Sequence, residues 1–61
     1  MMAPNDCGIQ NPNPLQPSDV ISIHNKCETF FVARGDTAAV AHTKACQLIK
    51  SMITNSGGNP N

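Results

Sequence analysis

Apolar residues recur with a regular period only between residues 19 and 54 of this chain. The 18 residues before this stretch hold four of the five prolines, set among Asn, Gln, Asp and Ser, and residues 55–61 read NSGGNPN. Such segments bury too little apolar surface to offset the entropy of ordering, so we expect disordered tails at 1–18 and 55–61. The remaining 36 residues fall below the ~40 at which domains usually need a disulfide, a metal or a partner chain.

The first half of the domain at 19–54 has the composition of a β-hairpin. The runs VISI, residues 20–23, and CETFFVAR, residues 27–34, are rich in β-branched and aromatic residues, and HNK lies between them. Alternate residues of a strand face opposite sides, and Asn25 tolerates the backbone geometry of a tight turn. An isolated hairpin is marginal in water, so it should pack against a helix.

The second half of the domain has the pattern of an amphipathic helix over residues 37–54. Asp36 is placed to cap its first turn and to complement the positive end of the helix dipole. Its apolar stripe is wider than a two-stranded hairpin needs, so we expect part of it to pack on a second copy of the chain. The predicted fold class is therefore α+β, a small ββα unit completed by homodimerisation, with self-association through Ala41, Ala45, Leu48, Ile49 and Met52.

Charge and hydropathy exclude two kinds of partner. Four basic residues balance four acidic ones, and the chain has no Trp or Tyr, which argues against a nucleic-acid surface. No apolar run approaches the ~18 residues of a membrane helix, and the N-terminus lacks the pattern of a signal peptide. We therefore expect a cytoplasmic protein, in which three cysteines cannot all pair within one chain.

Both histidines and two of the cysteines form two pairs whose spacing suits a metal. His24 and Cys27 flank the predicted turn, and His42 and Cys46 lie one helical turn apart. This arrangement resembles a ββα zinc finger, which implies zinc held by these four residues. The order is His-Cys then His-Cys, however, and 14 residues separate the pairs where ~12 are usual. Cys7 could serve as a substitute ligand, but it lies in an expected tail. The alternative is that all of these are ordinary turn, strand and core residues.

A second resemblance covers the 23 residues FFVARGDTAAVAHTKACQLIKSM, which begin at Phe30. They are similar to a group of short, uncharacterised pseudomonad proteins in which an F-x-V-x-x-G stretch precedes a helix rich in Ala and Leu. Phe30, Val32 and Gly35 match the first part of that pattern. The resemblance implies a small cytoplasmic accessory protein of bacterial or phage origin, and it brings no catalytic or ligand residues with it.

The predicted function is a non-enzymatic protein–protein interaction module. The few carboxylates form no close pair, and 36 residues hardly build the pocket that an oriented nucleophile and base require. We expect a homodimer that acts as a regulator or inhibitor by binding a bacterial protein, with Phe30 or Val32 at the contact. The alternative is a zinc-stabilised module that uses His24, Cys27, His42 and Cys46.

Overall fold

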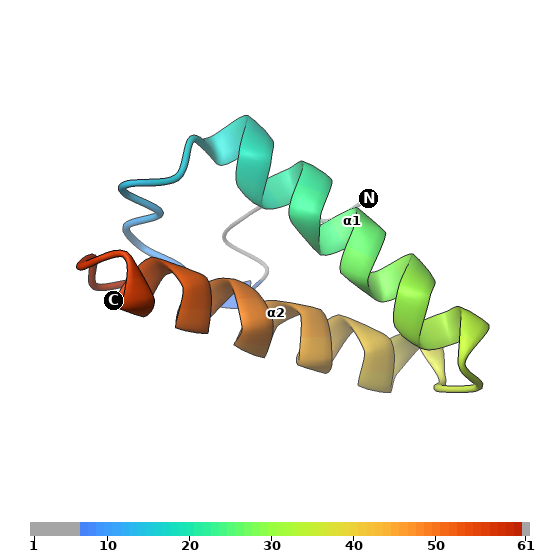
Figure 1. The fold of residues 1–61 in the computed structure, drawn as a ribbon. Coiled ribbons are helices and arrows are strands. Elements are labelled where there is room, and N and C mark those ends of the chain that lie inside the picture. The colour runs from blue at the N-terminus through green and yellow to red at the C-terminus, as the bar shows by residue number, and fades with distance from the viewer. Residues whose placement is uncertain (1–6, 61) are drawn as a thin grey trace.

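The computed structural model describes residues 7–60 and consists of two helices joined by a short turn (Figure 1). Helix α1 spans Pro17–Ala33 and helix α2 spans Ala38–Asn55. The helices lie closest at the connecting turn and diverge toward the opposite end, where the segment before α1 lies. This arrangement is a helical hairpin whose open end is filled by the N-terminal segment.

The predicted β-hairpin, and with it the α+β class, is wrong. Residues 20–33 lie within α1, and no strand occurs among residues 7–60. Helix α1 begins with Pro17 at its start and Asp19 in its first turn, and both positions favour a helix N-terminus. Among its buried and half-buried residues, Val20, Ile23, His24, Cys27 and Phe31 are spaced three or four positions apart along one face. The burial of that face outweighs the strand preference of the β-branched residues.

The helix expected at residues 37–54 is present as α2. The residue that caps it is Thr37, whose side chain accepts a hydrogen bond from the Val40 backbone N–H at 3.2 Å. Asp36, the predicted cap, instead pairs with Lys44 Nζ at 2.8 Å. The cap therefore lies one residue later than the prediction, and the acidic residue links the turn to the second turn of α2.

Both helices end in the same way, with a glycine in the left-handed region. Gly35 has φ 105° and Gly57 has φ 88°. The N–H of each glycine and the N–H of the residue after it donate to carbonyls of the last helical turn, as in Asp36 to Phe31 at 3.1 Å and Gly58 to Ile53 at 2.9 Å. This is the Schellman arrangement, which satisfies carbonyls that a helix end would leave free.

The core forms where α1, α2 and the N-terminal segment meet. Its buried apolar members are Cys7, Ile9, Val20, Cys46, Ile49 and Ile53, with Leu15 and Ile23 packed against them. The segments expected as tails therefore carry part of this packing, since Cys7 and Ile9 are buried. The C-terminal segment also returns to the N-terminal one, because the Gln10 N–H donates to the Pro60 carbonyl at 2.7 Å.

Within residues 7–60, neither helix combines the length and apolar character that crossing a bilayer demands.

A candidate metal centre

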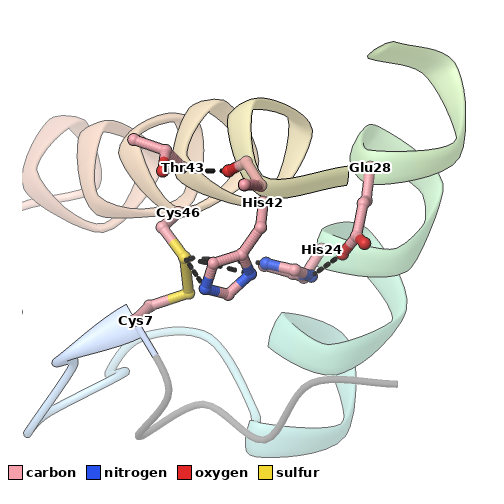
Figure 2. Close-up of polar contacts among 7 residues, drawn as sticks. Cys7, His24, Glu28, His42, Thr43 and Cys46 are labelled. Carbon is pink, nitrogen blue, oxygen red and sulfur yellow. Dashed lines mark hydrogen bonds and ion pairs between the residues drawn. A yellow bond between two sulfur atoms is a disulfide. The ribbon is translucent and has the colours of Figure 1, made fainter. Parts of the chain in front are cut away.

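Four side chains with soft or borderline donor atoms meet between the helices. They are Cys7 from the N-terminal segment, His24 from α1, and His42 and Cys46 from α2 (Figure 2). One donor atom of each residue lies within 4.8 Å of the donor atoms of the other three. His24 and both cysteines are buried, and His42 is half-buried. Two sulfurs and two imidazole nitrogens are the donor set of a Cys₂His₂ zinc site.

The helices bring three of these residues together through their regular spacing. His42 and Cys46 are four residues apart on α2, so both lie on one face, beside the buried stripe of Ala41, Ala45 and Ile49. His24 lies one turn after the buried Val20 on α1, and its ring centroid is 4.8 Å from that of His42. Cys7 reaches the same place from the N-terminal segment.

The two cysteines of this cluster form a disulfide in the structure. The Cys7–Cys46 bond joins residues 39 positions apart, so it closes a loop that contains the whole of α1 and the first half of α2. Closing a loop of this length lowers the conformational entropy of the unfolded chain, which stabilises the folded state by about 4 kcal/mol. For a domain this small, that contribution is comparable to what its hydrophobic core supplies.

The environment of His24 favours the neutral imidazole. The residue is 1% exposed, and this burial lowers its pKa below the ordinary value of 6.5. The nearby His42 lowers the pKa further, whereas the carboxylate of Glu28 raises it in part. A neutral ring keeps one nitrogen lone pair free, which is the form that binds a metal.

The two nitrogens of His24 face different groups. Nε2 lies 3.6 Å from Cys46 Sγ, whereas Nδ1 faces Glu28 Oε2 at 3.4 Å. Within the described part of the chain, Nδ1 has no hydrogen-bond partner, because this separation exceeds an ordinary N–H···O distance. A proton on Nδ1 is the state that a carboxylate there stabilises, and it leaves the Nε2 lone pair directed at the sulfurs.

Two sulfur–nitrogen distances within the cluster match those of a tetrahedral zinc site. Zinc–sulfur bonds of ~2.3 Å and zinc–nitrogen bonds of ~2.0–2.1 Å place neighbouring sulfur and nitrogen ligands about 3.6 Å apart. Cys46 Sγ lies 3.6 Å from His24 Nε2 and 3.6 Å from His42 Nε2. Only thiolates bind zinc in this way, so the two cysteines can act as ligands after the disulfide is reduced.

The structure brings together three of the four residues of the predicted zinc site. His24, His42 and Cys46 are in the cluster, whereas Cys27 is a half-buried free thiol on α1, outside it. Cys7 takes the fourth place, in a segment whose composition predicts disorder. The histidine and cysteine on α2 could be paired from their i, i+4 spacing, but no spacing rule links Cys7 to them.

The residues predicted for association divide between the core and the surface. Ala41, Ala45 and Ile49 are fully buried within the chain itself, whereas Leu48 and Met52 are exposed. The predicted partner-binding residues Phe30 and Val32 are also exposed, near the C-terminal end of α1.

Searches of protein-family models, curated proteins and solved structures found nothing that matches this chain.

Proposed function

We propose that the reduced protein is a small non-enzymatic module that binds one zinc ion through Cys7, His24, His42 and Cys46. The observation that carries this proposal is the convergence of two sulfurs and two imidazole nitrogens within 4.8 Å of one another. Soft and borderline donors in a tetrahedral S₂N₂ set select zinc over the hard cations that prefer oxygen.

The composition of the centre favours a structural role over a catalytic one. Four protein ligands fill the tetrahedral shell of zinc, whereas catalytic zinc sites keep a position open for water or substrate. Two thiolates also balance the charge of Zn²⁺, so the loaded centre is neutral. A neutral centre can be buried at low electrostatic cost, which agrees with the burial of Cys7, His24 and Cys46.

A metal in this place would supply the cross-link that a domain this small usually needs for stability. The ligands come from the N-terminal segment and from both helices, so one ion would hold all three parts of the core together. Binding energy at such a site is folding energy. A reducing compartment such as the cytoplasm keeps the required thiolates available, and it is the location we propose.

Metal titration of the reduced protein tests the proposal. We expect one Co²⁺ per chain, with the absorption of tetrahedral cobalt bound to thiolate, and its displacement by one Zn²⁺. Removing a ligand in His42→Ala should weaken Co²⁺ binding and shift the absorption, because water would have to take the fourth position. Cys27→Ser is the matched control, because Cys27 lies outside the cluster, and it should bind like the parent protein. A reduced protein that binds neither ion, or a Cys27→Ser variant that loses binding, would overturn the proposal.

The carboxylate beside His24 should adjust the affinity of the centre. Glu28 is not one of the four ligands, but its Oε2 is 3.4 Å from the nitrogen of His24 that faces away from the sulfurs. Partners of this kind orient a metal-bound histidine and raise its basicity, and their loss typically costs 10–100-fold in affinity. We expect Glu28→Gln to weaken zinc binding by a factor in that range, measured by competition with a chelator, with the 1:1 stoichiometry retained. Unchanged affinity would show that Glu28 has no part in the centre.

A protein-binding role is a second candidate, and exposed apolar side chains support it. On α1, Phe30 is 54% exposed and Val32 47%, and on α2, Leu48 is 43% exposed and Met52 39%. We propose that this module associates through such residues, with a second copy of itself or with a bacterial protein that it regulates. The zinc centre would then serve to hold the two helices that present them.

A further inference from the structure

The same two sulfur atoms serve the disulfide of the structure and the proposed zinc centre. Cys7 and Cys46 are bonded to each other in the structure, and they are also two of the four donors in the cluster. Zinc requires both sulfurs as thiolates, whereas a disulfide has no thiolate to offer. One chain therefore cannot hold the disulfide and a fully coordinated zinc ion at the same time.

We infer that Cys7 and Cys46 form a redox switch that determines whether this centre holds zinc or is closed by a disulfide. The inference rests on the proposed zinc site and adds its regulation. In the reduced state the module carries zinc on all four residues. In the oxidised state the ion is released, and the disulfide holds Cys7 against α2 in its place.

The interconversion balances with ordinary cellular reagents. One hydrogen peroxide and two protons convert the two zinc-bound thiolates to the disulfide, and they yield free Zn²⁺ and two waters. In the reverse direction, two molecules of a low-molecular-weight thiol reduce the disulfide by exchange and become one disulfide themselves. The two protein thiols then lose their protons as zinc binds.

The two states differ in how they restrain α1. The disulfide joins the N-terminal segment to α2 and includes no residue of α1. In the zinc state, His24 adds α1 to the cross-link, whereas in the disulfide state the Nε2 of His24 lies against Cys46 Sγ at 3.6 Å without a metal bond. The consequence of oxidation is therefore a loss of restraint on α1, while α2 stays tied to Cys7.

The chain has a third cysteine, Cys27, so the pairing of Cys7 with Cys46 is a specific prediction. Cys27 is a half-buried free thiol three residues after His24, so it competes in principle for either partner. The structure pairs Cys7 with Cys46, whose Cα atoms are 5.3 Å apart, within the usual range for a disulfide. The switch therefore requires this pair and leaves Cys27 reduced.

Peroxide treatment of the zinc-loaded protein tests the inference. The reduced protein is loaded with one equivalent of Zn²⁺, freed of excess thiol and treated with one equivalent of hydrogen peroxide. We expect release of one zinc per chain, read with a chromogenic chelator, together with a Cys7–Cys46 disulfide in the peptide map. Adding thiol and zinc should restore the loaded form. Cys27→Ser is the matched control and should respond like the parent protein.

Hydrogen exchange on the two forms adds a structural readout. Amides of α1 should exchange faster in the oxidised, metal-free protein than in the zinc-loaded protein, whereas those in the middle of α2 should change less. Equal exchange of α1 in the two forms would contradict the difference in restraint.

The possible failures are distinguishable. A reduced protein that takes up no zinc overturns the proposed function, and the switch with it. Two outcomes leave the zinc centre in place and overturn the switch. The protein binds zinc but keeps it after oxidation, or oxidation yields disulfides of Cys27 or cysteine sulfinic and sulfonic acids.

Discussion

Replacing Cys7 with serine should lower the free energy of unfolding of the oxidised protein by about 4 kcal/mol, the value expected for opening a loop of this length. The disulfide that is lost joins residues 39 positions apart and anchors the N-terminal segment beside α2. Small domains have little stability to spare, so much of the variant should be unfolded at physiological temperature. Chemical denaturation followed by the helical circular dichroism signal measures the loss.

Cys27→Ser is the control for this experiment, because it removes a thiol and leaves the disulfide intact. Its denaturation midpoint should stay close to that of the parent protein. A Cys7→Ser variant as stable as the parent under oxidising conditions would show that the Cys7–Cys46 bond does not support the fold.

Replacing Ile49 with alanine should cost 2–5 kcal/mol, the range measured for large-to-small changes in a packed core. Ile49 is fully buried on the face of α2 that meets α1 and the N-terminal segment. Its neighbour Leu48 is 43% exposed, so Leu48→Ala should cost less than about 1 kcal/mol. Both substitutions introduce alanine in the middle of the same helix. The difference between their unfolding midpoints therefore reports the difference in burial between Ile49 and Leu48.

The same pair of variants tests the predicted homodimer. If two copies associate through α2, Leu48 is buried between them, and Leu48→Ala should then be as costly as Ile49→Ala. The stability of the parent protein should in that case rise with its concentration. A small cost for Leu48→Ala together with a concentration-independent midpoint would show that this face of α2 does not mediate self-association.

The sequence predicts α2 well because two independent signals agree there. The apolar residues recur at helical spacing, and polar residues occupy the opposite face, so the expected helix at residues 37–54 matches Ala38–Asn55 closely. The buried stripe of Ala41, Ala45 and Ile49 follows from the same pattern. Only the capping residue differs, and helix ends are defined by local hydrogen bonds that neighbouring Asp and Thr residues can each supply.

The first helix could not be recognised from local preference alone. β-branched and aromatic residues of 20–32 favour a strand, whereas Val20, His24, Cys27 and Phe31 are spaced for one face of a helix. The helical spacing was the correct signal. It is easily overlooked because one of the two most buried positions in α1 is a histidine, which a hydrophobic pattern does not count.

The candidate metal site shows a different limit. Three of its residues lie on helices, where regular geometry relates sequence spacing to position. Cys7 lies in an irregular segment rich in Pro and Asn, whose path depends on long-range packing of Ile9 and Leu15 against the helices. Sequence spacing alone therefore leads to Cys27, which is three residues from His24, and not to Cys7.

The position of the disulfide also affects what a break in the backbone would do. Cys7 precedes α1 and Cys46 lies within α2, so the exposed turn at residues 34–35 falls inside the covalent ring that the bond closes. A protease that cuts this turn in the oxidised protein opens the ring without releasing either piece. In the reduced, metal-free chain no covalent bond joins the two fragments, so one cut there leaves the two helices on separate peptides.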